Sequence, residues 1–351
     1  MTDERARLVY VGSYTTDAGG KGEGISVFTQ DPDSGALTQH GPVTTITAPT
    51  FLAWHPSGEH MYAVNETNPG NVTGLAVDSS GALTAGASQL TGGDGPCHLT
   101  VHPRGGYVLC ANYGSGSISV HPILAGGEVG ARSDLVQHAG SGPDPDRQEG
   151  PHAHNVQLDL AGRRVLVIDL GTDEVRSYDL DLESGELETG PVARPTPGTG
   201  PRHAAFHPDG WVFVADELAS TVTSYRYETP TGALTLHGSV PATAEPVEDS
   251  IRNYPSEIAL STDGRFVYVA NRGADCITVF SVDGGDLTVV ADVPSGGTWP
   301  RHFAITGEFL YVANQNSDTV GIFRINAATG IPEPTGDILE VPSPACILPA
   351  H

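Results

Sequence analysis

Two recurring positions in this sequence carry ionisable side chains within otherwise apolar or small-residue segments. The first position directly follows a proline, and its occupants in chain order are Thr50, Cys97, His152, Arg202, Ser256, Arg301 and Ala345. The second position closes a β-branched segment, usually after Asn or Asp, and its occupants are Ser13, Glu66, Tyr113, Leu170, Glu217, Arg272 and Gln315. Packing alone does not select arginine, glutamate and histidine, so both positions are candidates for chemistry.

A third recurring position draws attention to one histidine. His154 lies in the segment GPHAHN (150–155), three residues after Pro151. At the same distance from their prolines the other copies carry Leu52, Leu99, Ala204, Ile258, Phe303 and Ile347. A polar side chain in an apolar column indicates that function has overridden packing, which makes His154 a candidate catalytic residue.

These side chains suit an anionic substrate that carries a carbonyl group. Arginines bind carboxylate or phosphate groups and stabilise an oxyanion in a site that excludes water. Glu217 or His154 can act as general base or acid. The candidates that come from four consecutive repeats, and are therefore expected to share one site, are His154, Arg202, Glu217, Arg272 and Arg301.

Other kinds of chemistry have weaker support. The sequence has no G-x-S-x-G motif for covalent acyl transfer. It also has no H-E-x-x-H motif and no Cys/His cluster, so we predict no metal site and no cofactor. A chelating role for His152 and His154, two residues apart on one strand, is the weaker alternative. The structural alternative for the whole set is a ring of salt bridges between repeats.

The elements that must position these residues form a repeat of about 50 residues. Its prolines stand at positions 49, 96, 151, 201, 255, 300 and 344. Segments like LVYVGSY (8–14) recur seven times, each followed by an alternating segment and a turn that contains glycine. We predict an all-β, seven-bladed β-propeller with four antiparallel strands per blade, as one domain spanning residues 1–351.

The two ends of the chain predict how the ring closes. The sequence begins with a segment of the second-strand type and ends with PACIL (344–348), a segment of the first-strand type. Pairing the N- and C-terminal strands would complete the seventh blade and leave no exposed sheet edge.

Composition limits the partners. The 351 residues include 17 basic and 42 acidic side chains, for a net charge of −25, which disfavours nucleic acid and anionic membrane surfaces. Four scattered cysteines suggest free thiols in a reducing compartment. Without a signal-peptide pattern or a long apolar run, we expect a soluble cytoplasmic protein.

Several stretches in this order resemble the bacterial 6-phosphogluconolactonase family, whose relatives include the carboxy-muconate lactonising enzymes. The resemblance spans nearly the whole chain, and its most specific stretches are RQEGPHAHN (147–155), GPRHAAFHPDG (200–210), ADEL (215–218), PSEIALSTDGRFVYVANRG (255–273) and WPRHF (299–303). It implies a seven-bladed propeller and metal-free chemistry on a cyclic ester. The family's central His, Arg, Glu and Arg correspond to His154, Arg202, Glu217 and Arg272. Asp216 and Asn155 depart from the common Asn and Ser of the family.

The resemblance implies a lactone hydrolase acting on 6-phosphogluconolactone. We expect Glu217, assisted by His154, to activate water, and Arg202 and Arg272 to stabilise the oxyanion. The expected substrate-binding residues are His152, Arg301, Arg147 and Tyr14, with Arg301 and Arg147 as the phosphate contacts. A muconate-type cycloisomerase and a non-catalytic interaction scaffold are the alternatives. We expect a monomer or weak homodimer whose partner is a small anionic lactone.

Overall fold

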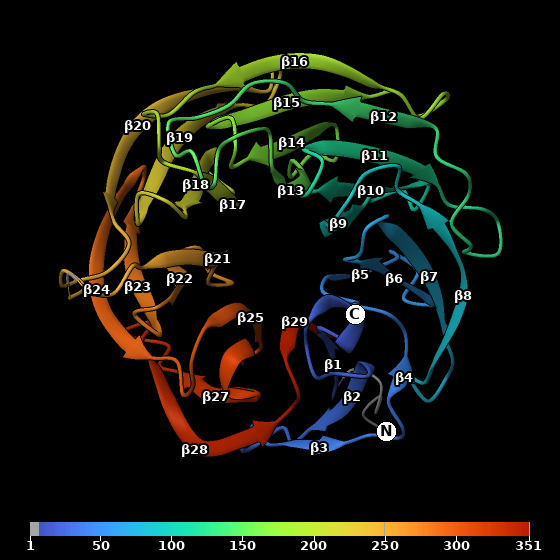
Figure 1. Cartoon of the computed structure of the whole chain (residues 1–351). Helices are drawn as coiled ribbons and strands as arrows, with labels where there is room; N and C mark the ends of the chain where they lie inside the picture. Colours follow the sequence, from blue (N-terminus) through green and yellow to red (C-terminus); the bar gives the residue numbers. More distant parts are fainter. Residues whose placement is uncertain (1–6, 249, 351) are drawn as a thin grey trace.

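The strands form seven antiparallel sheets arranged around a central axis in the computed structural model, which describes residues 7–248 and 250–350 (Figure 1). Each sheet is one blade, with its first strand innermost and its last strand on the outside of the ring. The predicted seven-bladed β-propeller with four antiparallel strands per blade is therefore confirmed. Two short 3-10 helices, Thr16–Ala18 and Gln315–Ser317, lie between strands.

Six blades each use four consecutive strands, so neighbours in the chain are neighbours in the sheet. Blades 2, 3 and 4 comprise β5 (Leu52–Trp54), β6 (His60–Asn65), β7 (Asn71–Val77), β8 (Leu83–Leu90); β9 (Pro96–Val101), β10 (Tyr107–Asn112), β11 (Ser117–Pro122), β12 (Asp134–Gln137); and β13 (Ala153–Leu158), β14 (Arg164–Asp169), β15 (Glu174–Leu180), β16 (Leu187–Ala193). Blades 5, 6 and 7 comprise β17 (Pro201–His207), β18 (Trp211–Asp216), β19 (Thr221–Glu228), β20 (Ala233–Pro241); β21 (Tyr254–Leu260), β22 (Phe266–Arg272), β23 (Cys276–Asp283), β24 (Asp286–Pro294); and β25 (Pro300–Thr306), β26 (Phe309–Asn314), β27 (Thr319–Ile325), β28 (Pro332–Glu340).

Blade 1 joins the two ends of the chain. Its strands are β29 (Pro344–Pro349), β1 (Leu8–Ser13), β2 (Gly24–Gln30), β3 (Leu37–Gln39) and β4 (Thr44–Thr45). β29 pairs antiparallel with β1, with Val11 opposite Ile347. β3 and β4 pair with opposite ends of β2, so together they replace one continuous outer strand. The predicted closure by pairing N- and C-terminal strands is confirmed.

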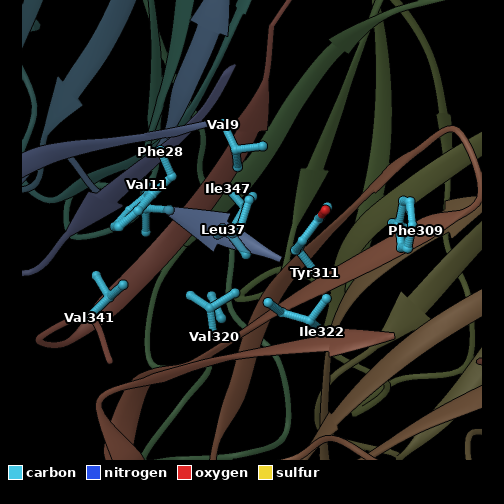
Figure 2. Packing of buried hydrophobic residues seen from close by; sticks show 11 residues of the cluster. Val9, Val11, Phe28, Leu37, Phe309, Tyr311, Val320, Ile322, Val341 and Ile347 are labelled. Carbon is cyan, nitrogen blue, oxygen red and sulfur yellow. The ribbon is translucent and has the colours of Figure 1, made fainter. Parts of the chain in front are cut away.

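Neighbouring blades are held together by apolar side chains that alternate along each second and third strand. Figure 2 shows the seam between blades 7 and 1, where Val11, Val320, Ile322 and Ile347 meet. A tyrosine on the second strand adds a polar contact across the seam. Tyr311, for example, donates its hydroxyl hydrogen to the carbonyl of a turn glycine of blade 1 at 2.7 Å.

The same contact recurs around the ring. The tyrosine-to-glycine pairs are Tyr10–Gly81, Tyr62–Gly127, Tyr268–Gly330 and Tyr311–Gly35. Glycine is required at such a turn because Gly35 has φ = 77° and a Cβ there would lie 2.4 Å from a ring carbon of Phe309. At these four seams the glycine turn therefore docks one blade onto the next.

Candidate active site

A β-bulge interrupts the first strand near one end in six of the seven blades. The extra residue is left without a partner on the second strand, and a bulge of this kind redirects its side chain. The residues at this position, together with the matching residue of blade 2, are called the bulge ring: Thr50, Cys97, His154, Arg202, Ser256, Arg301 and Ala345.

The strand register corrects the position given to His152. Counting from the proline aligned His152 with Arg202. In the sheet, however, Ala153 pairs with Asp169 and takes the place that Pro201, which pairs with Asp216, has in blade 5. Blade 4 is therefore shifted by two residues, and His154 occupies the bulge position. Val156, not His154, belongs to the apolar column. The expectation that His154 interrupts an apolar column was wrong, although the residue does stand beside the arginines.

The second recurring position needs one smaller correction. Its residues share a backbone hydrogen bond, in which Glu66, Tyr113, Leu170, Glu217 and Gln315 donate their N–H to the loop before the first strand. In blade 1 this bond is made by Tyr14, not Ser13. The strand-end ring is therefore Tyr14, Glu66, Tyr113, Leu170, Glu217, Arg272 and Gln315.

Glu217 is the centre of a buried ionic cluster. Its Oε1 accepts a hydrogen bond from Arg147 Nη2 at 2.6 Å, and its Oε2 accepts one from Arg272 Nη2 at 2.6 Å. Arg202 Nε lies 3.1 Å from the same Oε2. Burial would raise the pKa of Glu217, but Arg272, Arg202 and Arg147 outweigh it and lower the pKa to about 2. Glu217 is thus a carboxylate that holds three guanidiniums together.

The three arginines of this cluster differ in what else they contact. Arg202 is 1% exposed and donates to the Ser256 carbonyl oxygen at 2.6 Å, while its Nε faces Glu217 Oε2 in an ion pair. Arg272 lies beside the rings of Tyr254 and Trp299, with its Cζ 5.9 and 5.3 Å from their centroids. Such cation–π contacts fix the guanidinium in place. Arg202 is therefore held between Glu217 and the Ser256 carbonyl oxygen.

His154 stands among these cations as a neutral imidazole. Burial lowers its pKa well below the usual range for histidine, and Arg202 is the strongest of the nearby charges that lower it further. Its Nδ1 is buried and has no hydrogen-bond partner within residues 7–248 and 250–350. The Tyr113 ring approaches it edge-on, with centroids 5.5 Å apart. A neutral imidazole has a lone pair on one of its two ring nitrogens, which suits it to accept a proton.

A second cluster faces the first from blades 1, 2 and 7. Arg301 Nη2 lies 3.7 Å from Glu66 Oε2, and its Cζ lies 5.0 Å from the Tyr14 ring centroid. Tyr14 donates its hydroxyl hydrogen to Glu66 at 2.9 Å, and Thr50 donates to the same carboxylate at 2.6 Å. The two clusters together hold four guanidiniums against two carboxylates, so the centre is positively charged in a strongly acidic chain.

His152 does not join either cluster. Its Nδ1 bonds to the Tyr113 carbonyl oxygen at 2.9 Å and its Nε2 to Glu149 at 3.2 Å, while its ring stacks on the Tyr113 ring. Both ring nitrogens are thus used in holding the loop before β13. The other predicted residues, His154, Arg202, Glu217, Arg272, Arg301, Arg147 and Tyr14, are brought together.

Sequence reasoning missed a second ring of polar residues, one position further along each first strand. This histidine layer consists of Phe51, His98, Asn155, His203, Glu257, His302 and Cys346. The R-H pairs in GPRH and WPRH were the available signal, but only their arginines were selected. Glu66, Thr50 and Tyr113 were likewise not selected as site residues.

No group of three or more His, Cys, Asp or Glu is placed to hold a metal ion within the described ranges. The four cysteines, Cys97, Cys110, Cys276 and Cys346, are buried free thiols. No helix of the described residues is long and apolar enough to cross a bilayer.

The fold is a seven-bladed propeller whose centre gathers four arginines around Glu217 and Glu66, with His154 beside them. Residues 8–349 match the family described as lactonase, 7-bladed β-propeller, and the chain belongs to that family. A 6-phosphogluconolactonase of Bacillus subtilis (strain 168) is 36% identical over 299 residues, which cover 84% of this chain and 83% of that protein. The predicted family resemblance is thereby confirmed.

Two solved structures show how far the likeness extends in space. A periplasmic gluconolactonase of Pseudomonas aeruginosa superimposes with a TM-score of 0.91 at 30% identity, covering 97% of this chain and 98% of that one. A protein from Lactobacillus plantarum gives a TM-score of 0.90 at 32% identity, with the same coverage. Paired arginines are compatible both with a lactone hydrolase and with a non-catalytic interaction scaffold, so the ion pairs do not distinguish between these two kinds of protein. Family membership does, and the chain is a lactone hydrolase.

Proposed function

We propose that this protein hydrolyses 6-phosphogluconolactone to 6-phosphogluconate. The observation that carries the proposal is the excess of positive charge at the centre of a chain with net charge −25, where four guanidiniums meet two carboxylates. A phosphorylated lactone supplies both an anion for such a centre and a carbonyl that becomes an oxyanion. The names of the Bacillus subtilis relative and of a second relative from Formosa agariphila support the same substrate.

His154 is the general base in this mechanism, and Glu217 is the anchor of the arginines. Both Glu217 oxygens already accept short hydrogen bonds from arginines, so neither is free to take a proton from water. His154 is neutral, so one of its ring nitrogens has a lone pair that can accept a proton. This assignment revises the expectation that Glu217 activates water with help from His154.

Each bond change has a residue to assist it. His154 takes a proton from water as the water oxygen bonds to the lactone carbonyl carbon, and the carbonyl oxygen becomes an oxyanion. The buried guanidinium of Arg202 is the proposed donor to that oxyanion. When the ring C–O bond breaks, protonated His154 returns the proton to the departing ring oxygen, which becomes a hydroxyl.

The remaining arginines bind the substrate's anionic end. Arg301 and Arg147 are the phosphate contacts in this proposal, since their side chains are 14% and 30% exposed whereas Arg202 is almost fully covered. Tyr14 orients Arg301 through the contact of its ring with the guanidinium and through their shared partner Glu66. His152 contributes by holding Tyr113 beside His154.

A lactone panel tests the proposal. Acid release from 6-phosphogluconolactone, gluconolactone and a muconolactone is followed in a pH-stat, with ultraviolet detection of muconates for the cycloisomerase alternative. We expect the phosphorylated lactone to be hydrolysed fastest. Arg202→Ala should lower kcat by about 10²–10³-fold, as loss of an oxyanion donor does. Arg164→Ala, which removes an arginine paired with Asp179 in blade 4 away from the Glu217 cluster, is the matched control and should keep its activity.

Hydrolysis of the phosphorylated lactone no faster than in buffer would contradict the proposed substrate. Conversion of a muconate in its place would favour the cycloisomerase. We also propose a cytoplasmic location and a monomer or weak homodimer. Cell fractionation and size-exclusion chromatography test these two points, and the periplasmic relative makes the first a necessary measurement.

A further inference from the structure

A buried carboxylate in the histidine layer collects hydrogen-bond donors. Glu257 Oε2 lies 3.0 Å from His203 Nδ1 and 3.4 Å from His302 Nε2, and its Oε1 accepts a hydrogen bond from the Ile258 N–H at 3.1 Å. The side chains of His203, His302 and Glu257 are 4%, 12% and 12% exposed. Neither the bulge ring nor the strand-end ring includes any of these groups.

The tautomer of His302 shows how Glu257 is charged. The Ile347 N–H donates to His302 Nδ1 at 3.2 Å, so that nitrogen is an acceptor and the ring proton is on Nε2, facing Glu257. Burial raises the pKa of Glu257, while His302 and Arg202 oppose the rise. Three converging donors suit the ionised carboxylate, which only accepts. The His203 nitrogen that faces it, Nδ1, then also carries a proton.

This arrangement leaves two neighbouring ring nitrogens without partners. With its proton on Nδ1, His203 has a lone pair on Nε2, which is buried and unpartnered in the described ranges. His154 Nδ1 is in the same condition, and the two ring centroids are 5.1 Å apart. Buried polar atoms are rarely left unpaired. A proton on His154 Nδ1 satisfies both nitrogens, through a small ring rotation or one bridging water.

We propose that Glu257, acting through His203, holds His154 in the tautomer with its proton on Nδ1, so that His154 Nε2 is the atom that accepts the proton of water. Glu257 and His203 are positioning residues in this account, since neither touches the substrate. The kinetic part of the proposal rests on the function proposed above. The tautomer itself does not depend on which lactone is the substrate.

The charges around the two rings explain why such support is needed. The arginines, histidines and carboxylate that act on His154 and His203 include Arg202, Arg272, Arg301, His98, His302 and Glu257, and Tyr113 and Cys97 also contact His154. Of the first six, all but Glu257 are bases, and the arginines oppose a positive charge on His154. Glu257 is the one carboxylate hydrogen-bonded to His203 in the described residues, so it stabilises the imidazolium that forms when His154 takes a proton.

Histidine side-chain nitrogen NMR tests the tautomers directly. Protein labelled with ¹⁵N-histidine is compared with its Glu257→Gln variant, and His154→Gln and His203→Gln assign the signals. In the parent we expect the proton of both rings on Nδ1. The amide that Glu257→Gln introduces can donate to His203 Nδ1, so the proton of His203 should move to Nε2 and that of His154 should follow. An unchanged His154 tautomer in Glu257→Gln would overturn the proposal.

Steady-state kinetics with 6-phosphogluconolactone tests the consequence. Glu257→Gln should lower kcat by about 10–100-fold with KM within about twofold, since general base catalysis contributes about 10²–10⁴ in total. Asp159→Asn is the matched control, because it changes another buried carboxyl, at the other end of β13 from His154, that accepts a bond from Tyr227. That variant should lose stability but keep both kcat and the tautomers.

The outcomes separate this proposal from the proposed function. A changed tautomer with an unchanged kcat would overturn the positioning role. If the parent hydrolysed none of the lactones, the proposed function would fall while the NMR result still decided how His154 is held.

Discussion

The seams between blades and the residues around the central axis follow opposite rules. At four of the seven seams the same contact returns, with a strand tyrosine bonded to the turn glycine of the neighbouring blade. Around the axis the bulge ring changes at nearly every blade, from Thr50 and Cys97 to His154, Arg202 and Arg301. Contacts that are repeated between blades hold the ring together, whereas the candidate site is formed by positions at which the blades differ.

The difference has a physical origin in the bulge. Seam residues lie opposite partners in a regular ladder, so their side chains must fit a neighbouring blade. Bulge residues have no partner on the second strand, and their side chains are free to differ in size and charge without disturbing the sheet. A change at a seam should therefore cost stability, and a change at the centre should cost activity.

Among changes at the seams, opening the closed ring should lower the melting temperature most. We propose that residues 1–351 form a single domain, because β1 and β29 share one sheet. Deleting residues 342–351 removes β29 and should lower the melting temperature by more than about 10 °C or prevent folding. As a milder version, Ile347→Ala should cost about 2–5 kcal/mol, whereas Ile338→Ala at an exposed position should cost little. An unchanged melting temperature after the deletion would rule out the single closed ring.

Asp216 differs from the Asn found at the same position in other blades, and it should have a smaller, pH-dependent effect on stability. Asp216 accepts hydrogen bonds from Thr221 and Thr223, but its Oδ1 is buried and has no partner in the described part of the chain. Blades 6 and 7 have Asn271 and Asn314 here, and their amides donate to loop carbonyls. Burial, with a contribution from Asp173, raises the pKa of Asp216 to about 7.

The sign of the pH effect follows from that raised pKa. The folded protein holds a proton on Asp216 that the unfolded chain releases near pH 4, so this contribution to stability is complete below about pH 4 and is lost as pH rises through about 7. Asp216→Asn should raise the melting temperature at pH 8 and change it little near pH 4. Thermal unfolding across that range checks this. A variant that is less stable than the parent at pH 8 would contradict it.

The smallest expected effect compares two tyrosines. The Tyr268 hydroxyl donates to the Gly330 carbonyl at 2.9 Å, whereas the buried Tyr225 hydroxyl has no partner among the described residues. Tyr268→Phe should cost about 1 kcal/mol, and Tyr225→Phe should cost nothing measurable or stabilise slightly. Urea unfolding of both variants measures the difference. Equal losses would show that the seam contact has no energetic value, and kcat should be unchanged in both.

Features that recur from repeat to repeat could be predicted from the sequence, and features that do not recur could not. The blade count, the closing strand pair and the convergence of Arg202, Glu217 and Arg272 all followed from matching segments. The role of His152 did not, because the loop before β13 shifts the proline of blade 4 by two residues relative to the sheet. The low pKa of Glu217 and the histidine layer depend on which side chains meet across blades. Spacing along one strand carries no information about such contacts.

The division of labour between His154 and Glu217 is the central claim about the site. The most direct test is kcat and KM for 6-phosphogluconolactone in His154→Gln and Glu217→Gln, with folding checked by circular dichroism. His154→Gln should lower kcat by about 10²–10⁴-fold with little change in KM. Glu217→Gln, which releases three arginines from their anchor, should raise KM and lower kcat less. A His154→Gln enzyme with nearly parental kcat, beside an inactive but folded Glu217→Gln enzyme, would contradict this account.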